Sequence, residues 1–264
     1  MFQGWPAPSR FARPIDLLVD RGSPPARLAA PTISRVAVAE SDQSPEQRRE
    51  ALKRVFAQAQ TCVRCQELAS TRKNVVFGAG NADAELMFIG EAPGASEDER
   101  GLPFVGRAGK LLDTLLEEIG LERADVFIAN TLKCRPPGNR DPLPVELENC
   151  REYLYRQVEL IQPRVICSLG NFSTKLLRED PTGITRLHGK AEELTLGRRT
   201  VRLYPIFHPA AALYTPRMLE TLREDFSRLP ALLALAEPPQ PGAEEISPLQ
   251  DGEIAAAEDQ LGLF

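Results

Sequence analysis

Two groups of residues in this chain have the types and spacing that chemistry requires. The first lies on a loop of about fifteen residues that follows Gly90 and carries Glu91, Glu97 and Phe104. Loops between the strands and helices of α/β units usually have about two to six residues, and ligands in such folds bind at the carboxyl ends of the strands. We therefore expect Glu91, Glu97 and Phe104 to lie at a ligand site.

The second group consists of four cysteines. Cys62 and Cys65 form a C-x-x-C pair, and Cys134 and Cys150 lie sixteen positions apart. Four converging thiolates suit either a tetrahedral zinc ion or an iron-sulfur cluster, and reduced buried thiols are the alternative. The sixty-eight residues between Cys65 and Cys134 exceed what a compact zinc ribbon uses, which favours a cluster that ties two distant segments together. The fifth cysteine, Cys167, stands in the apolar run VICSL and is expected to pack in the core.

Four short apolar runs predict the strands that position these groups. They span Leu86 to Ile89, Val126 to Ala129, Val165 to Leu169 and Val201 to Phe207. Helical patterns separate the first three runs, which is typical of a parallel sheet covered by helices on both faces.

Helix signals surround these strands. Ser44-Pro45-Glu46-Gln47 has the form of a capping box, so a helix should begin there and carry Leu52, Val55 and Phe56 inward. A second helix is predicted between Gly106 and Gly120, and a last one from about Arg217 to Leu235. The clearest stripe follows Pro144 and consists of Leu147, Cys150, Leu154, Val158 and Ile161.

Composition divides the chain into three parts. We expect a disordered extension over residues 1–43, a folded domain over 44–236 and an acidic disordered tail over 237–264. The net charge is −5, but residues 47–236 carry +2, which leaves DNA binding open. No run approaches the roughly twenty apolar residues of a membrane span, and the N-terminus lacks a secretory pattern, so we expect a cytoplasmic protein.

Several separated motifs resemble those of one known family. They are GEAPG, which starts at Gly90, with Glu97 and GLPFVGRAG behind it, NTLKCRPPGNRDP from Asn130, HPAA from His208, and the four cysteines. In order and spacing they are similar to the family 4 uracil-DNA glycosylases, over about Cys62 to Asp225. A family 5 enzyme is expected to lack the acidic residue of the first motif, so Glu91 favours family 4.

The resemblance implies a fold, a cofactor and an activity. The fold is a three-layer α/β/α sandwich with a short, mainly parallel four-stranded sheet, as in uracil-DNA glycosylases. The activity is the hydrolytic removal of uracil from DNA in base excision repair, which leaves an abasic site and uses no catalytic metal. The cofactor is a 4Fe-4S cluster, with a structural role away from the chemistry, on Cys62, Cys65, Cys134 and Cys150.

The resemblance also implies roles for individual residues. Phe104 matches the residue that stacks on a flipped uracil, and Asn130 matches the one that reads its Watson-Crick edge. His208 matches the donor that stabilises the leaving group at O2, and Glu91 is the candidate for positioning water or stabilising the sugar cation. The full set of implied substrate-binding residues is Gly90, Glu97, Phe104, Asn130 and Asn139.

Other residues are candidates for contacts with DNA. Lys133, Arg135 and Arg140 are basic residues that could hold phosphates. Leu213 and Tyr214 follow His208 in the place where these enzymes push a side chain into the gap left by the flipped base. The family often has a basic residue near Tyr214, so either side chain could be the wedge.

The last five residues look like the bacterial sliding-clamp binding motif. A short peptide on a tether binds through a few apolar anchors, and it raises the local concentration of the enzyme at replicating DNA. The alternative is a chance match, although an apolar cluster at the end of a polar tail favours the motif. The predicted clamp-binding residues are Gln260, Leu261, Leu263 and Phe264.

Two other functions stay open at this point. One is a non-catalytic iron-sulfur DNA-binding module, for example an accessory subunit, and the other is a glycosylase for a different deaminated base. Intact Glu91, Asn130 and His208 argue against the first, and the size of the pocket decides the second. We expect a monomer that acts on uracil-containing DNA.

Overall fold

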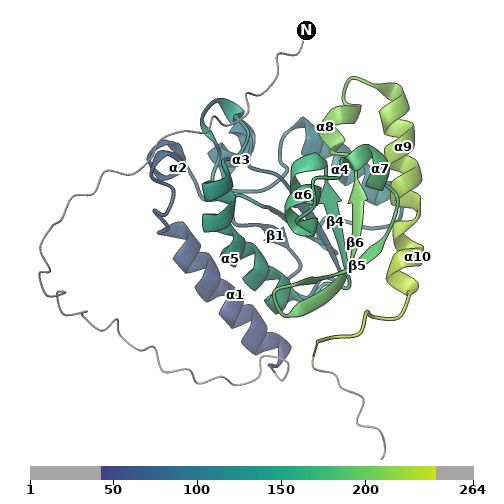
Figure 1. Ribbon diagram of the computed structural model, residues 1–264, viewed down its shortest axis with the longest axis horizontal. Helices are drawn as coiled ribbons and strands as arrows, with labels where there is room; N and C mark the ends of the chain where they lie inside the picture. Colours follow the sequence, from purple (N-terminus) through teal and green to yellow (C-terminus); the bar gives the residue numbers. More distant parts are fainter. Residues whose placement is uncertain (1–42, 242–264) are drawn as a thin grey trace, which may run out of the picture. The chain divides into compact units, whose positions relative to one another are not determined.

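The computed structural model describes residues 43–241, which fold around one sheet. Its strands lie in the order β1-β3-β2-β4-β6-β5, and Figure 1 labels β1, β4, β5 and β6 among them. The four inner strands, β3, β2, β4 and β6, run parallel, and the edge strands β1 and β5 are antiparallel to their neighbours. The bounds are β1 Ala79–Gly80, β2 Leu86–Gly90, β3 Phe127–Asn130, β4 Val165–Leu169, β5 Glu192–Leu196 and β6 Arg199–Ile206.

The four predicted strands are therefore confirmed as the parallel centre of the sheet, but the predicted total of four is wrong, because the sheet has six. The two missed strands have no apolar run that could reveal them. β1 has only two residues, and β5 alternates between half-buried and exposed side chains before a turn at Gly197 with φ +61°.

Helices cover both faces of this sheet, which confirms the three-layer α/β/α sandwich (Figure 1). Met87 and Ile89 of β2 face a core shared with α1 (Pro45–Gln60), α5 (Pro144–Ile161) and α6 (Asn171–Arg178). Leu86 and Phe88 face the opposite core, shared with α4 (Arg107–Glu118), α9 (Pro216–Ser227) and α10 (Leu229–Ala234). The shorter helices are α2 Gln66–Thr71, α3 Ala95–Arg100, α7 Ile184–Leu187 and α8 Pro209–Ala212.

The predicted helix starts are largely confirmed. Ser44 caps α1 reciprocally: its N–H donates to Gln47 Oε1 at 2.8 Å, and its Oγ accepts from Gln47 N at 3.3 Å. Phe56 was expected to point inward but is 39% exposed, and its ring contacts that of Phe77 with centroids 5.4 Å apart.

Two further segments differ from the prediction. The last helix is divided into α9 and α10, since Pro230 near the start of α10 has no N–H to continue α9. The long loop after β2 contains α3.

The packed chain continues beyond the expected boundary at Glu237. Gln240 exchanges hydrogen bonds with the backbone of Thr200 on β6, at 3.1 and 3.0 Å, and Glu237 pairs with Arg199 at 2.6 Å. The rest of the predicted tail, with its clamp-binding residues, and nearly all of the predicted N-terminal extension lie outside the described residues. Within residues 43–241, no helix is both long and apolar enough to cross a membrane.

Candidate functional site

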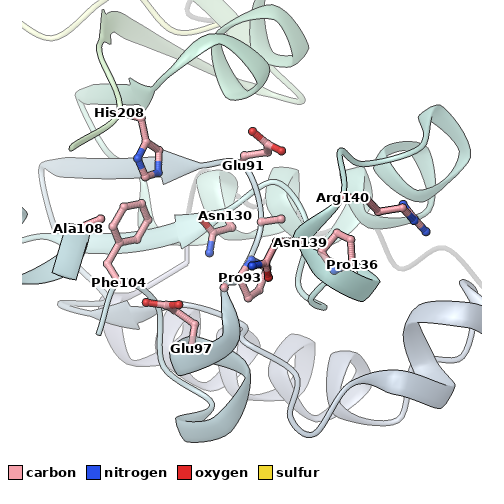
Figure 2. A pocket seen from close by; sticks show the side chains of 12 residues that line it. Glu91, Pro93, Glu97, Phe104, Ala108, Asn130, Pro136, Asn139, Arg140 and His208 are labelled. Carbon is pink, nitrogen blue, oxygen red and sulfur yellow. The ribbon is translucent and has the colours of Figure 1, made fainter. Parts of the chain in front are cut away.

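The carboxyl ends of the parallel strands enclose a cavity of about 310 Å³. Gly90 ends β2 and is in register with Asn130, which ends β3, while His208 follows β6. The chain order reverses between β2 and β4, the kind of point where α/β sheets bind ligands. The lining residues are Glu91, Ala92, Pro93, Gly94, Glu97, Phe104, Ala108, Asn130, Pro136, Asn139, Arg140 and His208 (Figure 2).

The amide of Asn130 stands in a slot that exists because residue 90 is a glycine. A Cβ on Gly90 would lie 2.4 Å from Asn130 Oδ1 and 2.7 Å from the ring of Phe104, so any side chain would displace both. Asn130 is 2% exposed, and its Oδ1 has no hydrogen-bond partner among the described residues. A buried polar atom left unpaired costs about 1–3 kcal/mol, and a ligand donor in the cavity would relieve that cost.

Phe104 is held in an unusual backbone conformation. Its φ is +50°, in the left-handed region that side chains disfavour. The Glu97 carboxylate accepts from the backbone N–H groups of Val105 and Gly106, both at 2.9 Å, and Arg123 Nη1 donates to the Phe104 carbonyl at 3.0 Å. These bonds fix the loop so that the aromatic ring faces the cavity (Figure 2).

His208 lines the cavity as a neutral imidazole with a defined tautomer. Its Nδ1 accepts from the backbone N–H of Ala210 at 3.1 Å, so the proton of the neutral ring is on Nε2. Burial lowers the pKa of His208 to about 4, and the charge of Glu97 opposes that shift. The ring lies against Phe104, with centroids 5.4 Å apart.

Glu91 is a half-buried carboxylate beside this imidazole (Figure 2). Burial raises the pKa of Glu91 to about 7, and the charge of Asp141 adds to the shift. Its backbone carbonyl accepts from Thr131 Oγ1 at 2.5 Å and from Leu132 N at 3.0 Å, which ties the loop after β2 to the segment after β3. The site thus holds a neutral histidine and a carboxyl group that titrates near neutral pH.

Asn139 and Arg140 of the predicted site have different surroundings. Asn139 lines the cavity, and its Oδ1 accepts from Arg135 Nε at 2.7 Å. Arg140 points its guanidinium away from the cavity (Figure 2) and pairs with Glu146 at 2.6 Å and Glu67 at 2.7 Å.

The prediction that Lys133 holds a phosphate is wrong, because Lys133 is only 1% exposed. Its Nζ donates to the backbone carbonyl of Asn130 at 2.8 Å and to Gln157 Oε1 at 2.6 Å.

The two candidate wedge residues differ in exposure. Tyr214 is 73% exposed and stands at the end of the α8 turn, whereas Leu213 is half-buried. The guanidinium of Arg107 lies over the Tyr214 ring at 5.2 Å and donates to its hydroxyl group. Arg107 is the first residue of α4 and follows Phe104 by three positions in the sequence. Its contact with Tyr214 therefore joins the Phe104 loop to the segment after α8.

Sequence reasoning did not single out several residues that shape the site, among them the following four. Pro93, Ala108 and Pro136 line the cavity, and Asp141 acts on the charge of Glu91. The first three lie inside motifs that the sequence analysis quoted, but apolar side chains give no chemical signal. The effect of Asp141 on the pKa of Glu91 depends on the fold, which brings the Asp141 loop close to the carboxyl ends of the strands.

The four predicted cysteine ligands are electrostatic neighbours beside this site. Burial raises the pKa of Cys134, and the thiols of Cys62 and Cys65 add to the shift. Burial also raises the pKa of Cys150 to about 11, with further contributions from Cys134 and Cys65. The fifth, Cys167, lies fully buried among apolar residues of the other core, as predicted.

Two side chains donate hydrogen bonds to these sulfur atoms. Arg72 Nη1 lies 3.2 Å from Cys134 Sγ, and Asn149 Nδ2 lies 3.4 Å from Cys65 Sγ. Within the part of the chain that the structure describes, no three His, Cys, Asp or Glu side chains are grouped closely enough to hold one metal ion. The donor set is nevertheless all-thiol and surrounded by donors, which fits an anionic iron-sulfur group.

Comparison with known proteins identifies close relatives. Residues 77–229 match the model of the uracil DNA glycosylase superfamily. The chain is 45% identical over 193 residues to a type-4 uracil-DNA glycosylase of Archaeoglobus fulgidus, which covers 72% of this chain and 96% of the relative. A type-4 uracil-DNA glycosylase of Thermotoga maritima is 41% identical over 167 residues, or 63% of this chain and 85% of the relative. A type-5 enzyme of Pyrobaculum aerophilum is 29% identical over 202 residues, or 64% of this chain and 88% of the relative.

Proposed function

The chain belongs to the uracil DNA glycosylase superfamily, and from this membership we propose that it removes uracil from DNA as a repair enzyme, by hydrolysis of the N-glycosidic bond. The observation that carries the proposal is the buried, unpaired amide oxygen of Asn130 in a cavity lined by Phe104 and His208. A binding module without catalysis would need none of these groups to converge. The relatives named above support the enzyme over that alternative.

Recognition of uracil follows from the chemistry of the Asn130 amide. The Oδ1 atom accepts from uracil N3–H, and the Nδ2 group donates to uracil O4. Cytosine presents an acceptor and a donor in the opposite order, so a fixed amide rejects it. The Phe104 ring supplies the flat surface on which the flipped base stacks. Gly90 keeps the slot open, and Glu97 holds the Phe104 loop.

Bond cleavage places negative charge on uracil O2, and His208 is the donor that we assign to it. Its neutral ring offers Nε2–H to the departing oxygen, and no proton has to move before the bond breaks. A preorganised donor of this kind contributes about 3–4 kcal/mol to the transition state in other enzymes.

We assign the carboxylate of Glu91 to the attacking water or to the sugar. In its ionised form it holds the attacking water or stabilises the positive charge that develops on the sugar. Asn139 also lines the cavity and completes the substrate-binding set.

Tyr214 is the residue that we assign to the gap left by the flipped base. It projects from the surface six residues after His208, and Arg107 contacts its ring in the protein without DNA. An aromatic ring fills the space between neighbouring bases better than the half-buried Leu213.

A 4Fe-4S cluster on Cys62, Cys65, Cys134 and Cys150 completes the proposal. The mutual influence of the four thiols and the donors at Arg72 and Asn149 support this ligand set. When bound, the cluster would join three parts of the chain, which are the segment before α2, the segment after β3 and helix α5.

Clamp binding by the last five residues and the monomeric state stay predictions from the sequence. They concern residues and contacts that the structure does not describe.

The proposed activity predicts a strict base preference that Asn130 sets. Oligonucleotides with one uracil, thymine, hypoxanthine or cytosine should yield alkali-labile abasic sites at uracil only. Asn130→Asp loses the donor for O4, so the ratio of uracil to cytosine release should fall by at least about a hundredfold. His208→Ala should slow uracil release about 10²- to 10³-fold with an unchanged preference. Equal release from uracil and hypoxanthine would point to a broader deaminated-base glycosylase, and no release at all would point to a binding module.

The raised pKa of Glu91 predicts an acid limb in the rate of uracil release. Because the carboxyl group is protonated below about pH 7, single-turnover rates should rise as pH increases through that value. Histidine 208, with a pKa of about 4, stays neutral over this range and should add no limb. Glu91→Gln should be slower and lack the limb, and Asp141→Asn should move the limb to lower pH. An unaltered limb in Glu91→Gln would remove Glu91 from the mechanism.

The wedge assignment predicts a defect that depends on DNA structure. Tyr214→Ala should reduce kcat/KM on double-stranded uracil DNA about fivefold to a hundredfold, since stacking on a base contributes about 1–3 kcal/mol. Single-stranded DNA needs no gap filled, so its cleavage should change little. Tyr214→Phe should keep most of the activity, and Leu213→Ala serves as the neighbouring control. A larger defect for Leu213→Ala would reverse the assignment.

The cysteine assignment predicts metal content. Purified protein should contain about four iron atoms and matching acid-labile sulfide per chain, with a broad visible absorption that bleaches on reduction. Cys65→Ser and Cys134→Ser should lose iron and melt at a lower temperature, and Cys167→Ala should retain it. Stoichiometric zinc without sulfide would contradict the cluster.

A further inference from the structure

Lys133 is the one lysine among the described residues whose side chain is almost completely buried, and its ammonium group is anchored on both sides. Its Nζ donates to the Asn130 carbonyl at 2.8 Å and to Gln157 Oε1 at 2.6 Å, and it lies 5.8 Å from the centre of the Phe77 ring. Gln157 in turn donates to the Phe77 carbonyl at 2.9 Å. The Nζ group is thus held within a connected network of hydrogen bonds.

The same lysine also contacts the cysteine group. It directly precedes Cys134, and its backbone and its charge both lower the pKa of the Cys150 thiol, against the larger effect of burial. Burial lowers the pKa of Lys133 to about 7, and the charges of Cys150 and Cys134 oppose that shift, so negative charge on these two sulfur atoms favours the ammonium form. Gln157 and Cys150 lie on the same helix, α5, so the helix that carries one cysteine also holds the partner of Nζ.

We propose that Lys133 is a positioning residue that joins the cysteine cluster to the uracil-reading Asn130. The inference rests on the proposed function, because it needs both the cluster and the role of Asn130. On one side, the ammonium group offsets the negative charge of the ligated thiolates. On the other, it holds the carbonyl of Asn130, so the backbone that carries the reading amide cannot rotate.

Through this arrangement, a cluster with a structural role influences the position of Asn130 and so the release of uracil. The amide of Asn130 has little freedom, since Gly90 and Phe104 border it within the slot. A backbone rotation at Asn130 would therefore misalign the donor and acceptor that face the base. Hydrogen bonds to charged groups contribute about 1.5–3 kcal/mol, more than neutral ones, which suits Lys133 to this restraint.

The test replaces Lys133 with methionine, whose unbranched side chain matches the apolar part of lysine but lacks the amino group and its charge. The Lys133→Met protein should retain its iron and visible absorption, and kcat for uracil release should fall about tenfold to a hundredfold. The reduction potential of the cluster should become more negative, because a nearby positive charge stabilises the reduced state. Lys53→Met removes an exposed charge on α1 and should change neither quantity.

A second variant keeps the test decisive if Lys133→Met does not fold. Gln157→Met retains the positive charge and frees one side of the ammonium group. Uracil release should slow while the potential stays close to that of the wild type. Wild-type rates in Gln157→Met, or an unchanged potential in folded Lys133→Met, would overturn the inference.

The two levels of the proposal fail in different ways. Wild-type protein that releases uracil but contains no iron would overturn the role of Lys133 and leave the glycosylase intact. Wild-type protein that holds the cluster but releases no uracil would overturn the proposed function, and with it the coupling to Asn130.

Discussion

The site depends on one steric constraint, the absence of a side chain at Gly90. Parallel register places Gly90 beside Asn130 at the carboxyl edge of the sheet, and the space of one missing Cβ holds the Asn130 amide against the Phe104 ring. The amide oxygen is buried there without a partner, at a cost of about 1–3 kcal/mol. In the function that we propose, the N3–H group of uracil becomes the partner of that oxygen, and the relief of this cost favours binding of the base.

Burial of the site shifts the pKa values of the two catalytic candidates in opposite directions, and each shift favours the uncharged form. Desolvation disfavours the charged form of any group, so it raises the pKa of Glu91 and lowers that of His208. The result is a neutral imidazole, which suits the donor role that we propose for His208, and a carboxyl group that ionises near neutral pH. The strained backbone of Phe104 belongs to the same design, because Glu97 and Arg123 hold it in place by hydrogen bonds to main-chain atoms.

Sequence reasoning predicted the strands and the helix start that a local pattern of side chains is enough to indicate. The four parallel strands are apolar runs, and the Ser44 cap is a local pattern, so both were predictable. Strand β5 was not, because four of its five side chains are exposed or only half-buried. Lys133 was misassigned to phosphate, since a sequence of polar and basic residues does not show which charge turns inward. The unpaired oxygen of Asn130 and the left-handed Phe104 are products of packing, which no spacing encodes.

The most direct test of the account is a crystal structure of the protein bound to DNA that carries an uncleavable 2′-fluoro-2′-deoxyuridine. The account predicts the flipped base in the cavity, stacked on Phe104, with N3–H on Asn130 Oδ1 and O2 facing His208 Nε2. A base that remains stacked in the duplex, or that enters the cavity without contacting Asn130, would contradict it.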